Sequence, residues 1–212
     1  MEIGPDGKIK APDLPDEKVE EIQREFIRQL EFPKEKYQPQ FFLCPVGRIG
    51  SGKSTVVRAL MKYFPLLRIA NDNLRKIFHD RGYNYNRTRE LTWPLVERYA
   101  REGYSIALDS NSASDSARKM WPQFNDLVKE VGAKVIWIHI NPPDEYIINK
   151  LRNYPHTWLF KDGEHAVLRY VARKPEKPVD DIPFVFTFDP SRSDFNKQIE
   201  DAARIIQKNL LK

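Results

Sequence analysis

Short apolar runs along the chain alternate with segments in which apolar residues recur every three or four positions. The runs are typical of buried strands and lie at residues 41–46, 66–70, 105–108, 135–140 and 184–188. The periodic segments are typical of amphipathic helices and lie at 74–80, 88–101, 117–131, 144–152, 164–173 and 194–210. Strands separated by helices indicate βαβ units. The pattern therefore predicts an α/β fold with a mostly parallel sheet covered on both faces.

The first 38 residues precede this alternation. Residues 1 to about 14 are polar and contain Gly and Pro, which predicts a mobile tail. From Pro15 onward a helix is predicted, because four apolar residues share one face: Val19, Ile22, Phe26 and Leu30. We expect this N-terminal helix to be a strut packed against the sheet, not a separate functional module.

Composition narrows the possible partners only slightly. With 212 residues, the chain has the length of one domain with a short appendage. The net charge of +5 modestly favours an anionic partner such as nucleic acid or phosphate. Cys44 is the one cysteine, so no disulfide framework is possible. Because no apolar stretch approaches 18 residues and the N-terminus is not signal-like, we expect a soluble, cytoplasmic protein that does not contact a membrane.

A phosphate-binding motif follows the first predicted strand of the alternating region. Residues 47–54, Gly-Arg-Ile-Gly-Ser-Gly-Lys-Ser, satisfy every fixed position of the P-loop pattern G-x-x-x-x-G-K-[ST]. Backbone N–H groups of such a loop wrap the phosphates, and the following helix adds the positive end of its dipole. Lys53 is expected to reach the β- and γ-phosphates, and the Ser54 hydroxyl to bind Mg²⁺. The motif predicts a site for ATP and Mg²⁺ formed by Gly47, Arg48, Ile49, Gly50, Ser51, Gly52, Lys53, Ser54 and Thr55.

Polar residues at the ends of two other predicted strands are candidates for the phosphate acceptor site, since ligands in such folds lie beyond the carboxyl ends of the strands. Asp72 precedes Arg75 by three residues, so both side chains can share one helical face. Asp72 would accept the proton of an attacking hydroxyl while Arg75 orients an anionic group. The alternative is an Asp helix cap beside an exposed Arg. Asp109 is a candidate to hold Mg²⁺ through water or to position the acceptor, and Asn111 either binds the acceptor or caps a helix.

The P-loop, residues 71–75, residues 108–111 and Arg118 together resemble the polynucleotide kinase branch of the P-loop kinases. This AAA_33-like group includes 5′-hydroxyl polynucleotide kinases, to which the likeness is closest, zeta toxins and chloramphenicol phosphotransferases. The resemblance spans roughly residues 41–190. It implies a five-stranded, mostly parallel, three-layer α/β/α kinase fold with a mobile lid. It also implies that Asp72 is the general base and that Arg75 contacts a nucleic-acid phosphate.

The resemblance further implies a lid after the fourth strand, at about residues 150–165, that brings an arginine onto the ATP phosphates. Arg152 is the first candidate and Lys150 the second; the alternative is a pair of solvated basic residues at a helix end. By fold analogy, residues 189–192 would flank the adenine. The chain departs from the family at Arg48 and Ile49, where a small residue or Pro is common. We divide it into a tail with the N-terminal helix, residues 1–38, and a P-loop kinase domain, residues 39–212.

The identity of the acceptor stays open among three readings. Residues 78–89 mix aromatic side chains with arginines, a combination that binds single-stranded nucleic acid, although it also occurs in ordinary surface loops. The leading reading is therefore an ATP-dependent kinase for the 5′-hydroxyl of RNA or DNA. The second is a kinase for a small hydroxyl compound such as a nucleotide-sugar or an antibiotic. The third is a nucleotide-binding switch without catalysis.

Overall fold

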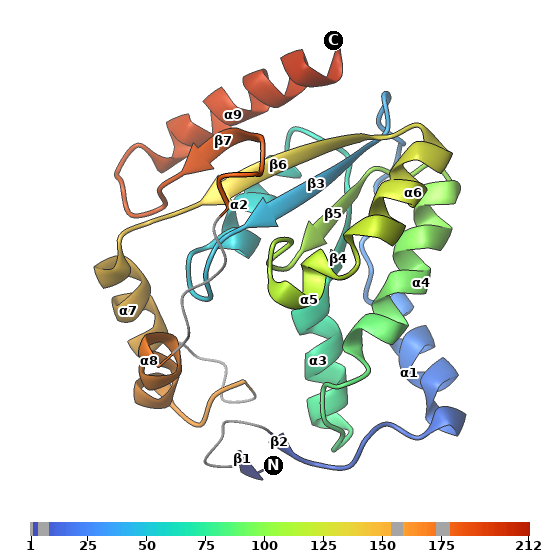
Figure 1. Ribbon diagram of the computed structural model, residues 1–212, viewed down its shortest axis with the longest axis vertical. Helices are drawn as coiled ribbons and strands as arrows, with labels where there is room; N and C mark the ends of the chain where they lie inside the picture. Colours follow the sequence, from blue (N-terminus) through green and yellow to red (C-terminus); the bar gives the residue numbers. More distant parts are fainter. Residues whose placement is uncertain (1, 4–8, 154–158, 173–178) are drawn as a thin grey trace.

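The chain folds around a parallel sheet, as Figure 1 shows for the computed structural model, which describes residues 2–3, 9–153, 159–172 and 179–212. Within these ranges the main sheet has five strands in the order β4-β5-β3-β6-β7. Their bounds are β3 (Phe41–Val46), β4 (Leu67–Ala70), β5 (Ile106–Asp109), β6 (Lys134–Ile140) and β7 (Phe184–Phe188). All four neighbouring pairs are parallel. The predicted α/β fold with a five-stranded parallel sheet is confirmed, with the P-loop strand β3 at the centre.

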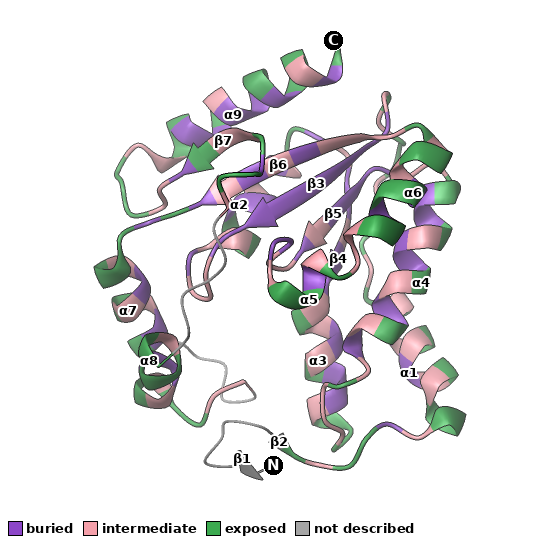
Figure 2. Cartoon of the chain, in the orientation of Figure 1, coloured by how far each residue is buried: buried purple, intermediate pink, exposed green. Residues whose placement is uncertain are grey.

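The central strand is buried on both faces, which explains why its sequence is apolar without alternation. Phe41 and Leu43 belong to the core cluster that includes α2 (Lys53–Leu60) and α9 (Phe195–Leu210). Phe42 and Cys44 belong to the opposite cluster, formed with helices α3 (Asn71–Asp80), α4 (Thr88–Arg101) and α6 (Trp121–Val131). Figure 2 shows buried residues along β3 and along the inner faces of the helices on both sides. The layers are therefore helix, sheet and helix.

The N-terminal helix α1 (Asp16–Arg28) lies on other helices instead of directly on the sheet. It packs against α3 (Asn71–Asp80) and α4 (Thr88–Arg101), where Ile22 and Phe26 are buried. Before it, β1 (Glu2–Ile3) pairs with β2 (Ile9–Lys10) in an antiparallel ladder. The segment that joins β2 to α1 is held by Asn84, whose backbone N–H donates to Pro12 O at 2.9 Å and whose Nδ2 donates to Ala11 O at 3.0 Å. The part of the tail nearest α1 is thus attached to the loop between α3 and α4.

Two local features differ from the expected pattern. Helix α3 begins at Asn71, directly after β4, although the helix was expected only from residue 74. The helix expected over residues 117–131 is two helices, α5 (Asp115–Arg118) and α6 (Trp121–Val131). Pro122 lies in the first turn of α6. Proline is tolerated there because backbone N–H groups of the first turn make no hydrogen bond within the helix, whereas it would interrupt one helix that ran on from α5.

Helices α7 (Asp144–Arg152) and α8 (Gly163–Val171) pack against each other after β6. In Figure 1 this pair and the group α1, α3 and α4 lie on opposite sides of the carboxyl ends of β3 and β5. Residues 154–158 of the expected lid lie outside the described residues. In the described ranges, none of the helices combines the length and the apolar character that crossing a membrane requires.

Candidate functional site

The P-loop connects β3 to α2, and its glycines are needed for its backbone geometry. Gly52 has φ of 102° at the N-cap of α2, a left-handed conformation that favours glycine. At Gly47 a Cβ would lie 2.4 Å from the carbonyl oxygen of Ile140 on β6, which is closer than packing allows. Lys53 Nζ donates to the carbonyl oxygens of Gly47, at 2.9 Å, and Arg48, at 2.8 Å. The ammonium group is therefore held over the loop that is expected to carry the phosphates.

Asp109 at the end of β5 faces the P-loop. Its Oδ1 accepts a hydrogen bond from Ser54 Oγ at 3.0 Å, and its Oδ2 accepts one from Arg68 Nε at 2.6 Å. The Asp109 side chain is only 1% exposed, so its charge needs a partner in the protein, and the Arg68 guanidinium supplies one. Sequence reasoning missed Arg68. Its signal was an arginine inside the apolar run 66–70, which implies a buried ion pair.

The hydroxyl of Ser54 and the carboxylate of Asp109 are hard oxygen ligands of the kind that Mg²⁺ takes. Arg68 occupies Oδ2 but leaves Oδ1 directed at Ser54. Among the described residues, no group of three or more His, Cys, Asp and Glu side chains is arranged to bind a metal. Since Mg²⁺ at phosphate sites is held by few protein ligands together with water and phosphate oxygens, this pair fits it.

Asp72 and Arg75 form an ion pair in the first turn of α3, with Arg75 Nη1 2.9 Å from Asp72 Oδ1. The pair lies at the same edge of the sheet as the P-loop contact, because Ala70 at the end of β4 is in register with Asp109. The N-cap residue of α3 is Ala70, whose side chain makes no capping hydrogen bond, and Asp72 lies inside the helix. The alternative reading of Asp72 as a helix cap is therefore not what the geometry favours. Asn111, by contrast, accepts a hydrogen bond from Ala113 N at 3.2 Å, as a local turn residue does.

The P-loop also contacts helices α7 and α8, through Arg48 and Ile49, the two residues that depart from the pattern of the P-loop kinases that the sequence resembles. Arg48 forms an ion pair with Asp144 at the start of α7 and donates to Pro142 O at 3.1 Å. Its guanidinium lies 5.6 Å from the ring centroid of Tyr170 on α8, and Tyr170 OH donates to Asp144 Oδ1 at 3.1 Å. The hydrogen bond from Arg48, followed by that from Tyr170, lowers the pKa of Asp144. Ile49 packs on the apolar cluster between α7 and α8.

The two basic candidates of the lid have different surroundings. Arg152 Nε donates to Glu164 Oε1 on α8 at 2.9 Å, and both side chains are exposed. Lys150 is half-buried, and a Cβ at Gly52 would lie 3.5 Å from its Nζ. Burial lowers the pKa of Lys150. The structure therefore brings Lys150 to the P-loop and directs Arg152 to α8.

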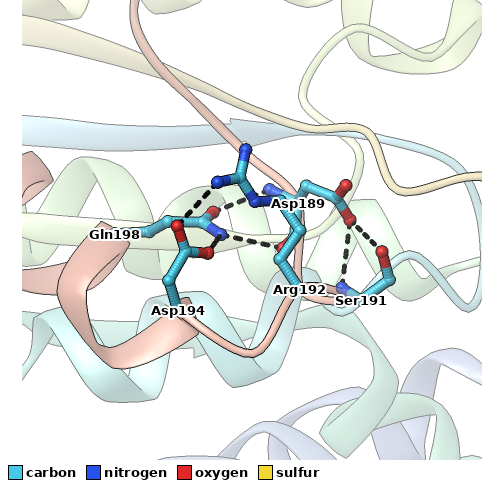
Figure 3. A network of polar contacts seen from close by, with 5 residues as sticks. All are labelled: Asp189, Ser191, Arg192, Asp194 and Gln198. Carbon is cyan, nitrogen blue, oxygen red and sulfur yellow. Dashed lines mark hydrogen bonds and ion pairs between the residues drawn. The ribbon is translucent and has the colours of Figure 1, made fainter.

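The loop after β7 also lies next to the P-loop, at Gly52. Pro190 Cγ lies 3.3 Å from the position that a Cβ at Gly52 would take. Gln198 on α9 holds this loop by accepting from Asp189 N at 2.9 Å and donating to Asp189 O at 3.0 Å (Figure 3). Gln198 Nε2 also donates to Asp194 Oδ1 at 2.8 Å. Sequence reasoning did not single out Gln198, and only its place on the buried face of a helix distinguishes it.

Two of the arginines among residues 78–89 form ion pairs with acidic residues of α1. Arg81 pairs with Glu25 on α1 at 2.6 Å and with Glu21 at 3.2 Å. Arg87 pairs with Asp16 of α1 at 2.7 Å. The tyrosines of this segment pack against the core cluster below it. These contacts favour a structural interpretation for Arg81 and Arg87. Arg89 instead donates hydrogen bonds to Ser114 and Ser116.

The comparisons with known proteins agree with this architecture. The AAA_33 family, described as an AAA domain, matches residues 43–169. The APS kinase CysC of Mycobacterium tuberculosis, solved with AMPPNP and APS, is 16% identical with a TM-score of 0.54, over 79% of this chain and 98% of that one. A structure of the PezAT toxin-antitoxin system of Streptococcus pneumoniae is 16% identical with a TM-score of 0.57, over 94% and 98%.

At this identity the likeness to solved structures shows a shared fold. No sequence among the curated proteins matches the chain. The family match, in contrast, extends from β3 into α8 and covers more than half of the residues. The chain belongs to the AAA_33 family and has the fold of a P-loop kinase.

Proposed function

We propose that the protein is an ATP-dependent kinase that transfers the γ-phosphate to a hydroxyl acceptor. The observation that carries this is the Asp72–Arg75 ion pair, at the sheet edge where Asp109 bonds to Ser54 of the P-loop. A P-loop alone binds a triphosphate, but a carboxylate beside it gives an acceptor hydroxyl a proton acceptor.

In the proposed reaction, Asp72 takes the proton of the acceptor hydroxyl as its oxygen bonds to the γ-phosphorus. The bond between that phosphorus and the β–γ bridging oxygen breaks, and ADP leaves. Arg75 orients an anionic group of the acceptor, and Lys53 binds the phosphate oxygens. Mg²⁺, held by Ser54 and Asp109, would neutralise phosphate charge. We assign the lid cation to Lys150, because its Nζ lies at Gly52 while Arg152 pairs with Glu164.

Two acceptor classes remain candidates. The resemblance to polynucleotide kinases supports the 5′-hydroxyl of RNA or DNA. The ion pairs of Arg81 and Arg87 with acidic residues of α1 favour a small hydroxyl compound, because those guanidinium groups are already neutralised. The acceptor side of the site, in either case, has to recognise a hydroxyl that lies next to an anionic or polar group.

An acceptor screen tests the proposal. The purified chain would be incubated with γ-labelled ATP, Mg²⁺ and 5′-hydroxyl oligonucleotides, nucleotide-sugars or hydroxylated antibiotics, with the Lys53→Ala variant run beside it. We expect label to move to one class of acceptor and only with the native chain. ATP binding without transfer to any acceptor would instead support a nucleotide-binding switch.

A further inference from the structure

A small pocket lies between the sheet and helices α4, α5 and α6, on the acceptor side of the site. Three tryptophans line it, Trp93 of α4, Trp121 of α6 and Trp137 of β6, together with Met120 and Phe124. Its volume is about 80 Å³. An apolar cavity of about 150 Å³ binds benzene, so a pocket of about 80 Å³ holds at most one six-membered ring.

The pocket contains a buried polar group that the protein does not satisfy. Ser112 is 7% exposed and lines the pocket, and its hydroxyl has no hydrogen-bond partner among the described residues. A buried hydroxyl without a partner is uncommon in native proteins, because its desolvation is then uncompensated. Trp121, in contrast, already donates its indole N–H to Ser112 O at 3.1 Å. The unsatisfied Ser112 hydroxyl is therefore available to a polar atom on an otherwise apolar ligand.

Arg89 lies at the pocket, and Arg75 lies close enough to Arg89 for their charges to interact. Arg89 lines the pocket and donates hydrogen bonds to uncharged oxygens: Ser116 O at 2.8 Å, Ser116 Oγ at 2.9 Å and Ser114 Oγ at 3.4 Å. Burial and, to a smaller extent, the charge of Arg75 lower the pKa of Arg89. Arg75 Nε is buried and has no hydrogen-bond partner in the described part of the chain. Asp72 pairs with Arg75, whereas Arg89 has no ion pair among the described residues, which leaves positive charge for an anion.

The pocket adjoins the proposed general base. Asn71 and Ser110 line it, and these residues are next in sequence to Asp72 and Asp109. We propose that the pocket is the ring subsite of the acceptor: it takes one uncharged six-membered ring with a polar group for Ser112, while Arg75 and Arg89 hold an anionic group of the same ligand. This deepens the proposed kinase function and rests on it. A terminal pyrimidine nucleotide of a polynucleotide and a free ring compound with a phosphate share this chemistry.

Calorimetric binding of uridine 3′-monophosphate tests the subsite without any phosphate transfer. We expect it to bind about tenfold more tightly than adenosine 3′-monophosphate, because a purine overfills the pocket. Ser112→Ala should weaken uridine 3′-monophosphate binding by about fivefold, as one neutral hydrogen bond does, and Arg89→Gln by about 10- to 100-fold, as a charged one does. Arg98→Gln, an exposed arginine on the same helix, is the matched control and should not change binding.

ATP affinity, measured for every variant, reports whether the protein is folded and the P-loop intact. Equal binding of the two nucleotides, no binding of uridine 3′-monophosphate to ATP-competent protein, or unchanged binding in both Ser112→Ala and Arg89→Gln overturns the subsite. A 5′-hydroxyl oligouridylate that binds more tightly than the mononucleotide identifies a polynucleotide end as the source of the ring, and equal affinity identifies a free compound. If the nucleotide binds as expected but no acceptor is phosphorylated, the kinase proposal fails while the pocket stands.

Discussion

Lys53 and Arg89 are both basic residues of the candidate site, but the residues to which they donate hydrogen bonds lie at very different distances along the sequence. Lys53 Nζ bonds to carbonyl oxygens five and six residues earlier in its own loop. Arg89 reaches across 25 and 27 residues, to serines in the segment around α5. The proposed phosphate side, residues 47–55, is thus built mainly within one contiguous loop, while the proposed acceptor side is assembled from α3, α4, α5, α6 and the strand ends.

This difference follows from what each side recognises. Phosphate groups are common to all nucleoside triphosphates, and backbone N–H groups with one lysine are sufficient to bind them. To recognise an acceptor, a protein needs a pocket of matching shape and specific side chains. In the proposed acceptor side these side chains come from separate helices and strands, one or two from each. Single changes on the phosphate side should therefore abolish transfer for every acceptor, whereas changes on the acceptor side should alter which acceptor reacts.

The largest effect is expected on the phosphate side. Lys53→Ala should lower the rate of phosphate transfer by about 10³-fold, because it removes a fixed positive charge from the transferring phosphate. Initial rates with saturating acceptor measure this. Lys62→Ala, an exposed lysine just after the same helix, should leave the rate unchanged. A Lys53→Ala enzyme that kept most of its activity would mean that the P-loop does not serve phosphate transfer.

The next effect separates the two sides. Asp72→Asn should lower the transfer rate by about 10²-fold, the scale of a lost general base, and should leave ATP affinity unchanged. The matched control is Asp80→Asn, which removes an exposed carboxylate from the same helix where it pairs with Lys76. Rates and ATP dissociation constants are needed for both variants. Loss of ATP binding in Asp72→Asn would assign the carboxylate to the phosphate side instead.

The same contrast explains how far sequence reasoning could reach. The five strands and the P-loop were predictable, because each is a contiguous pattern of apolar residues or a fixed motif. The ion pair of Arg68 with Asp109 and the pocket around Ser112 were not, because they join residues from separate elements, and only the strand order brings these together. The break between α5 and α6 had a local signal in Pro122, but a continuous apolar pattern across residues 120–131 hid it.

The proposed lid is a third region to compare, and we expect substitutions of its two basic candidates on α7 to have a smaller effect on the transfer rate. Lys150→Ala should lower the transfer rate by about 10- to 100-fold, the worth of one charged hydrogen bond to a phosphate. Arg152→Ala should change it by about twofold at most, because its pair with Glu164 is exposed. Because both residues lie on α7, a difference between the two rates reflects the position of each side chain and not a general effect on the helix. The reverse order of effects would return the role of lid cation to Arg152.

The smallest effect concerns the contact between the P-loop and the lid helices. Asp144→Asn removes the charge that Arg48 and Tyr170 share, and since the Arg48–Asp144 pair is partly exposed we expect a loss of stability of about 0.2–1 kcal/mol. Thermal unfolding of native and variant protein measures it. Because the folded-state pKa of Asp144 is lowered, this contribution is fully present above the ordinary value of 3.8 and is lost as pH falls through the lower folded value.

The stability difference between native and Asp144→Asn protein should therefore be constant from pH 8 to about pH 5 and shrink only below about pH 4. Glu145→Gln, an exposed carboxylate in the same first turn of α7, is the control for charge at the helix N-terminus alone. If both variants lose the same stability, the helix dipole accounts for the effect. A larger loss for Asp144→Asn means that Arg48 of the P-loop also stabilises α7. The P-loop would then depend on contacts outside its own contiguous sequence.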